Sequence, residues 1–259
     1  MLIIGKYVDL NSDVGESFGR YKLGHDELVM KYISSVNIAC GWHAGDSLVM
    51  EDTVHLARQH GLGIGAHPGY PDLTAFGRRN IDITPKEART YLIYQLGALT
   101  AFATAAEGRV DHVKLHGAFY NMVSENATFA KEIAKAVYDV DKNLIVLALA
   151  GSKLVTACRE IGLKVAEEVF ADRAYNSDGT LVARTLPGSM ILDKTEAVER
   201  AVKMVLEGTV KTIDGKEIKL NANSICVHGD NPEAIAFVEL ISSKLKENGV
   251  ELRSLKNLG

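Results

Sequence analysis

Four histidines each follow a short apolar run that is typical of a buried strand, and each has a glycine close by: His43, His67, His116 and His228. An imidazole titrates near neutral pH, so it can act as a general acid or base, orient a carboxylate or bind a metal. One histidine at such a position is as often a hydrogen-bonded turn residue as a functional group. Four at equivalent positions predict a shared site.

Carboxylates occur at or near the same strand ends: Asp13, Glu16, Asp46, Asp72, Glu168, Asp172 and Asp230. An aspartate within reach of a histidine can orient it or serve as general base. Asp46 and Asp230 stand just before predicted helices, so helix capping explains them as well as chemistry does. Asp13 has no helix directly after it, which makes Asp13 the stronger candidate for a catalytic carboxylate.

Cations lie on or just after the same strands and loops: Arg78, Arg79, Lys114, Arg173 and Arg184. Guanidinium groups match carboxylates and phosphates in a bidentate way, although the Arg78–Arg79 pair also fits plain surface charge. Lys114 is different because it lies inside an apolar strand, two residues before His116. A lysine there must reach a partner or a polar pocket, since burying an unpaired charge is costly.

Seven short apolar stretches alternate with helical patterns, at residues 7–10, 36–40, 62–66, 112–115, 144–149, 164–166 and 224–227. This alternation predicts a parallel sheet built from βαβ units. Polar residues follow nearly every strand, and no G-x-G-x-x-G follows the first one, which favours a closed barrel over a Rossmann sheet. We expect one domain over residues 1–259, with a loop–helix–hairpin excursion at about 176–222.

Composition limits the classes of function. The chain is 47% hydrophobic and 24% charged with a formal net charge of -4, as expected for a soluble globular protein that binds neither nucleic acid nor a membrane. Three cysteines in apolar contexts indicate a reducing compartment, and we expect a cytoplasmic protein. The sequence has no P-loop and no G-x-S-x-G elbow, so a nucleotide must be bound in another way or by a partner, and serine catalysis is disfavoured.

Taken together, these motifs resemble the LamB/YcsF family of 5-oxoprolinase A subunits. The resemblance is carried by residues 9–19, 37–46, 65–72, 76–79, 113–121, 149–152, 168–175, 178–182 and 225–230. It implies a seven-stranded α/β barrel similar to the glycoside hydrolase/deacetylase superfamily. It also implies cleavage of 5-oxo-L-proline to L-glutamate with ATP as co-substrate, and two partner subunits, B and C. Mg²⁺ is the divalent ion that would accompany the ATP.

The residues suit this chemistry. We expect Asp13, with His43, His67 or His116, to act as general base on water, and Asp46 is an additional catalytic candidate. The expected substrate-binding residues are Asn11, Glu16, Arg78, Arg79, Lys114, Glu168, Arg173, Arg184 and His228. Within that set, Lys114 and the arginines would hold the substrate carboxylate and phosphoryl oxygens, while Asn11 and His228 would donate to the oxyanion. The sequence does not distinguish the three histidines, and no residue is assigned to a protein-bound metal.

Two other interpretations fit the same residues. The first is a metal-dependent amide hydrolase similar to a sugar deacetylase, with Asp13, His67 and His116 as metal ligands. The second is a subunit that binds 5-oxoproline without catalysing its cleavage. The number of titratable groups at the predicted strand ends favours an enzyme, because perturbed titratable groups gather where chemistry occurs.

Overall fold

Seven parallel strands close into a barrel in a computed structural model that describes residues 6–229 and 231–257. In spatial order they are β1 (Tyr7–Val14), β2 (Ser35–Ala39), β3 (Gly63–His67), β4 (His112–Val113), β5 (Ile145–Leu149), β6 (Val165–Phe170) and β9 (Ser224–Val227). The barrel closes because β9 also pairs with β1, for example Leu10 with Ile225. The predicted seven-stranded parallel barrel is confirmed.

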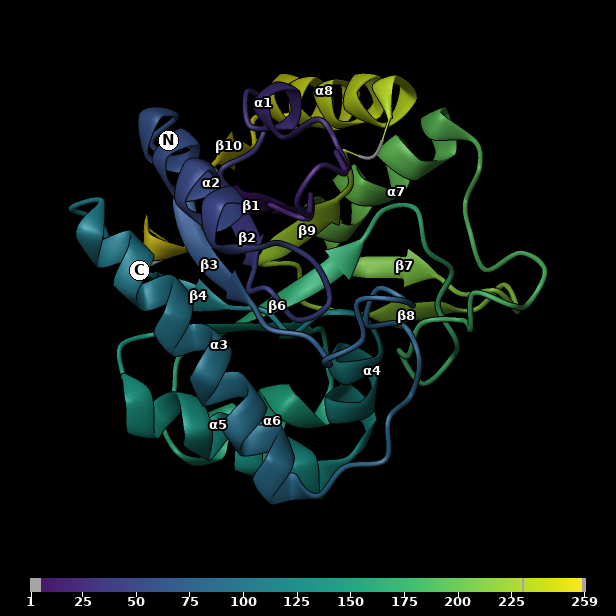
Figure 1. The fold of residues 1–259 in the computed structure, drawn as a ribbon. Coiled ribbons are helices and arrows are strands. Elements are labelled where there is room, and N and C mark those ends of the chain that lie inside the picture. The colour runs from purple at the N-terminus through teal and green to yellow at the C-terminus, as the bar shows by residue number, and fades with distance from the viewer. Residues whose placement is uncertain (1–5, 230, 258–259) are drawn as a thin grey trace.

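Helices cover the outside of the barrel (Figure 1). They are α1 (Asp26–Val29), α2 (Ser47–Gln59), α3 (Pro85–Ala105), α4 (Gly117–Glu125), α5 (Ala127–Val140), α6 (Lys153–Glu160), α7 (Lys194–Glu207) and α8 (Pro232–Glu247). Thr84 and Glu87 form the capping box that starts α3. Asn231 caps α8, and Asp230 lies outside the described residues. No helix in the described ranges combines the length and apolarity needed to cross a bilayer.

The excursion between β6 and β9 contains the predicted helix, α7, and the predicted hairpin. The hairpin consists of β7 (Thr209–Lys211) and β8 (Glu217–Lys219), which pair antiparallel beside the barrel (Figure 1). At the other end of the chain, β10 (Glu251–Leu252) adds to the start of β1, and a short 3-10 turn, η1 (Leu255–Asn257), follows.

Strand β1 is longer than its apolar residues predict. The sequence suggests an end at Leu10, but the strand continues to Val14 and carries Asp9, Asn11 and Asp13 on one face. These three side chains point into the barrel, where they bond to side chains of other strands. The interior of the barrel is therefore partly polar, and these three side chains are satisfied by other side chains within it.

Asp9 is fully buried at the start of the row of inward-facing polar side chains on β1. Its carboxylate accepts hydrogen bonds from Ser34, Ser35 and Ser224, yet burial raises its pKa from 3.8 to about 6. The folded chain therefore holds this proton more tightly than the unfolded chain does. The resulting stabilisation, about 3 kcal/mol, is complete only well below pH 3.8 and is lost as the pH rises through 6.

Urea unfolding of wild type and Asp9→Asn at pH 4 and pH 7 measures this effect. Between the two pH values the wild type should lose about 2.4 kcal/mol of unfolding free energy relative to Asp9→Asn. Taking the difference between the two proteins removes the contribution of every other titrating group. An equal difference at both pH values would contradict the prediction.

Candidate active site at the barrel mouth

Lys114 lies just after the short strand β4 and is buried inside the barrel. Its Nζ is 3.0 Å from Oδ1 of Asp13 and 3.0 Å from Oε1 of Glu168. The same nitrogen donates to Oδ1 of Asn11 at 3.2 Å. Burial alone would lower the pKa of Lys114, but Asp13 and the other neighbouring acidic groups raise it well above its usual value. Lys114 is therefore a fixed cation whose partners are protein groups.

Asp13 connects this buried network to solvent, since 15% of its side chain is exposed. Its Oδ1 accepts from Nδ2 of Asn37 at 2.8 Å as well as from Lys114, and its Oδ2 is 3.3 Å from Nε2 of His67. Burial favours the neutral acid, but His67 and Lys114 outweigh it and hold the pKa of Asp13 well below the usual range. Asp13 is thus a carboxylate at neutral pH, with one oxygen facing a histidine.

His67 and His116 are held by backbone carbonyls. Nδ1 of His67 is 2.8 Å from the carbonyl oxygen of Lys114, and Nε2 of His116 is 2.8 Å from that of Phe76. A carbonyl only accepts, so both of these nitrogens carry hydrogen. The other two nitrogens, Nε2 of His67 and Nδ1 of His116, face each other at 3.0 Å. Two bare lone pairs would repel at this distance, so a proton or another cation must lie between them.

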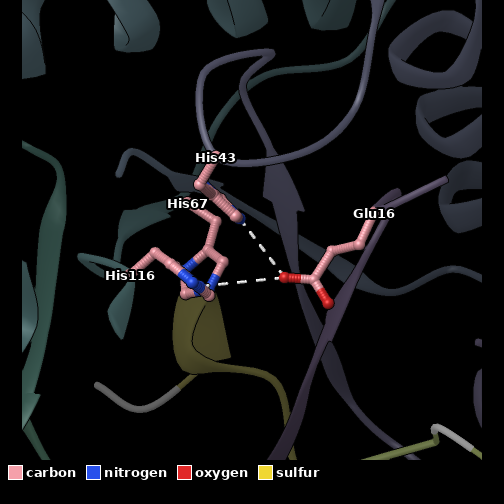
Figure 2. A group of neighbouring side chains, drawn as sticks. All are labelled: Glu16, His43, His67 and His116. Carbon is pink, nitrogen blue, oxygen red and sulfur yellow. Dashed lines mark hydrogen bonds and ion pairs between the residues drawn. The ribbon is translucent and has the colours of Figure 1, made fainter. Parts of the chain in front are cut away.

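His43 completes a group of three imidazoles with Glu16 (Figure 2). Its ring stacks on His116 with centroids 3.7 Å apart and planes 4° from parallel. Nε2 of His43 lies 3.2 Å from Oε1 of Glu16, while Nδ1 of His116 lies 3.8 Å from the same oxygen. Burial, and then the neighbouring imidazoles, lower the pKa values of His43 and His116 well below their usual value. Both rings are therefore neutral at pH 7.

The loop from Asp72 to Arg79 packs directly over these rings. Phe76, which has a positive φ of 56°, contacts His43 and His116 edge to face. Gly77 is required there, because an added Cβ would lie 2.8 Å from Cβ of His43, and its φ of 62° also favours glycine. The loop thus sets the position of both rings and supplies the carbonyl that fixes the hydrogen of His116.

The opposite side of the mouth is formed by β6 and β9. His228 and Asp172 are partly exposed there, with Nδ1 of His228 3.8 Å from Oδ2 of Asp172. Beside them opens a cavity of about 290 Å³ whose walls include Cys226, Met190 and Phe237. Two of its lining residues, Cys226 and His228, also bring ligand-type atoms within 4.8 Å of Asp13. A cavity near 300 Å³ with mixed walls suits a small molecule.

Several predicted site residues therefore converge on the mouth: Asn11, Asp13, Glu16, His43, His67, Lys114, His116, Glu168 and His228. Asn11 and Glu168 were predicted to contact the substrate, but in the structure their contacts are with other protein groups. Both N–H groups of Asn11 are used, at 2.9 Å by Glu168 and 2.8 Å by Ser224, and Asn11 and Glu168 are fully buried. Both bond to Lys114, whose Nζ also contacts Asp13, and their predicted contact with substrate stays a prediction.

Other predicted residues have partners elsewhere. Asp46 caps α2 and also accepts from the backbone nitrogen of Gly19, so its capping role is confirmed and its catalytic role stays a prediction. Arg79 pairs with Asp72, and Arg78 lies over the ring of Phe76.

The two remaining arginines lie on the loop that follows β6. Arg173 is buried and donates to the carbonyl of Val182, whereas Arg184 is exposed. The contacts of these arginines depend on the conformation of the loops that carry them. That conformation could not be predicted from the sequence.

Sequence reasoning missed several residues of the network, among them His112, whose Nε2 lies 2.8 Å from Oδ1 of Asn37. Asn37 bridges Asn11 and Asp13 from inside β2, and Oη of Tyr120 donates to Oε2 of Glu168 at 2.8 Å. A polar residue within the apolar run 36–40 was the available signal for Asn37. Tyr120 lies on α4, a helix that the sequence did not predict, because residues 116–121 were expected to form the loop after the fourth strand.

Comparison with known proteins bears on this site. The LamB/YcsF family matches residues 8–259. The chain belongs to the LamB/YcsF family. The resemblance inferred from its motifs is confirmed.

Curated relatives agree with this family membership. The 5-oxoprolinase A subunit of Fusobacterium nucleatum is 53% identical over 249 residues, which cover 96% of this chain and 97% of the relative. The 5-oxoprolinase A subunit of Pyrococcus furiosus is 55% identical over 245 residues, covering 95% and 96%. Both alignments span almost the whole of each protein.

Solved structures support the fold. A lactam utilization protein from Thermus thermophilus is 41% identical with a TM-score of 0.91, covering 96% of this chain and 100% of that one. A putative cellobiose-phosphate cleavage protein from Enterococcus faecalis has a TM-score of 0.60 at 13% identity, covering 98% and 99%. The second likeness concerns the fold alone.

Proposed function

We propose that this chain is the A subunit of a 5-oxoprolinase, which opens 5-oxo-L-proline to L-glutamate at the expense of ATP. The observation that carries the proposal is Asp13, a carboxylate held ionised by Lys114 beside His67 at the partly exposed mouth of the barrel. The names of relatives that are more than half identical over nearly the full chain supply the substrate. The cavity beside His228 has the size for so small a ligand.

A lactam is a resonance-stabilised amide that resists attack by water, and transfer of the ATP γ-phosphoryl group to the amide oxygen would activate the ring carbon. Water then adds to that carbon, and Asp13 takes its proton. The ring C–N bond breaks, and Asp13 passes the proton to the departing nitrogen. A second water hydrolyses the resulting acyl phosphate to glutamate and phosphate, which balances the atoms.

The other side chains divide into two groups. Lys114, Asn11, Asn37 and Glu168 hold Asp13 in place and ionised. His228 is a partly exposed donor that lines the cavity, and we assign it to the developing oxyanion. The proposed carboxylate and phosphoryl contacts of the arginines remain predictions, with exposed Arg78 and Arg184 as candidates.

Phosphoryl transfer requires a nucleotide site. The sequence has no P-loop, so we propose that subunits B and C complete the nucleotide site and that any Mg²⁺ enters with the ATP. The test is an ATP-dependent assay of glutamate release from 5-oxoproline, with the chain alone, the two partners alone, and all three together. We expect release only from the three together. Equal release by the two partners without this chain would refute the proposal.

A further inference from the structure

The facing ring nitrogens of His67 and His116 carry no hydrogen atoms of their own, which suggests that they bind an ion between them. Nε2 of His67 and Nδ1 of His116 are 3.0 Å apart, and both rings are turned so that a backbone carbonyl takes the N–H on the other side. Histidines that bind metals have this arrangement, because a carbonyl or carboxylate fixes the tautomer and leaves the free nitrogen for the ion. The two ring planes are 90° apart, so their lone pairs can converge on one point.

Glu16 provides a third ligand atom at that point. Its Oε1 is 3.8 Å from Nδ1 of His116, and with His67 the three residues bring one ligand atom each within 4.8 Å of one another. Ligands about 2.0–2.1 Å from a tetrahedral ion are separated by about 3.3 Å from each other. The separations of 3.0 and 3.8 Å lie on either side of this value. We propose that Glu16, His67 and His116 bind a divalent first-row transition-metal ion such as Zn²⁺.

His43 belongs to the same group by distance but not by direction. Its ring is stacked on His116 and nearly parallel to it, and the lone pairs of parallel rings lie in separate planes that do not meet. His43 instead donates from Nε2 to Oε1 of Glu16 at 3.2 Å, which agrees with its Nδ1 having no hydrogen-bond partner. His43 thus orients the carboxylate ligand, as outer-shell groups do in metal sites.

A second group at the mouth, Asp13 with Cys226 and His228, is a weaker candidate for a metal site. Nζ of Lys114 already lies 3.0 Å from Oδ1 of Asp13 and 3.1 Å from Sγ of Cys226. A fixed ammonium at that position repels a divalent ion. His228 therefore provides a matched control: a histidine at the same mouth, in the group that should not bind the ion.

The proposed ion goes beyond the proposed function, because Asp13 needs no metal for the steps given above. Oδ2 of Asp13 is 3.3 Å from the ligand atom of His67, so a water on the ion would lie next to the proposed base. A bound divalent ion lowers the pKa of such a water and makes it a better nucleophile at neutral pH.

The test uses the chain alone and requires no catalytic assay. Wild type, Glu16→Gln, His116→Gln and His228→Gln are stripped with a chelator and titrated with Co²⁺ and Zn²⁺. Bound metal is counted by mass spectrometry, and the visible Co²⁺ spectrum reports coordination. We expect one ion per chain for wild type and His228→Gln, and affinity more than about a hundredfold weaker for the other two variants. Circular dichroism verifies that each variant is folded.

Glu16 is partly exposed, so Glu16→Gln keeps the test decisive even if His116→Gln does not fold. Absence of stoichiometric metal on the wild type would overturn the proposal and leave a shared proton between His67 and His116. Loss of the ion by His228→Gln, with retention by Glu16→Gln, would also overturn it. Neither result depends on whether the chain releases glutamate, so failure here is distinct from failure of the proposed function.

Discussion

Replacing Lys114 with methionine is expected to lower the free energy of unfolding by about 3–5 kcal/mol, because it leaves buried acidic partners without their cation. Nζ of Lys114 is within 3.0 Å of both Asp13 and Glu168, and Glu168 is fully buried. Methionine has a similar length, so the loss reflects charge more than volume. The pKa of Asp13 would rise as well, since Lys114 is one of the groups that lower it.

Urea unfolding of Lys114→Met measures this prediction, with Lys135→Met as a control. Lys135 is an exposed partner of Asp139 on α5, and a surface pair of this kind contributes about 0.3–0.5 kcal/mol. The double variant Lys114→Met/Glu168→Gln should recover part of the loss, because it removes one of the two uncompensated charges. A Lys114→Met protein as stable as its Lys135→Met control would show that Lys114 does not hold the network together.

The barrel was predictable because apolar runs and helical patterns alternate so regularly along the chain. The same signal failed where polar residues belong to strands. Asn11 and Asp13 were placed after the first strand, and Glu168 after the sixth, yet all three lie within strands that line a polar interior. Hydrophobicity cannot reveal such positions, since their polar groups are satisfied only by partners on distant strands, such as Lys114 for Glu168.

The convergence of histidines was predictable for a related reason. In a parallel barrel all carboxyl ends of strands lie at one mouth, so His67, His116 and Asp13 had to be near one another. The roles of the arginines were not predictable, because their contacts depend on loop conformation. The tautomers of His67 and His116 also required the structure, since the carbonyls of Lys114 and Phe76 fix them.

Replacing Asp13 with asparagine should reduce kcat for glutamate release by about 10²–10⁴, the usual contribution of a general base. Asparagine has the same shape, and its Oδ1 can still accept from Asn37 and Lys114. The fold should therefore persist while the group that takes the proton from water is lost. Because 5-oxoproline is expected to contact His228 and the adjoining cavity as well, KM should change much less than kcat.

Two controls separate catalysis from structure. Asp139→Asn removes an exposed carboxylate on α5 that pairs with Arg89, far from the mouth in the fold, and should retain the wild-type rate. Thermal unfolding of Asp13→Asn should confirm a cooperative transition, so that a low rate does not reflect an unfolded chain.

The most direct measurement is the initial rate of glutamate release by wild type and by folded Asp13→Asn, each assembled with subunits B and C at saturating 5-oxoproline and ATP. We predict a rate at least about a hundredfold lower for Asp13→Asn. A wild-type rate from Asp13→Asn would contradict the proposed role of Asp13, because ring opening would then not depend on the carboxylate that Lys114 and His67 hold ionised at the mouth of this barrel.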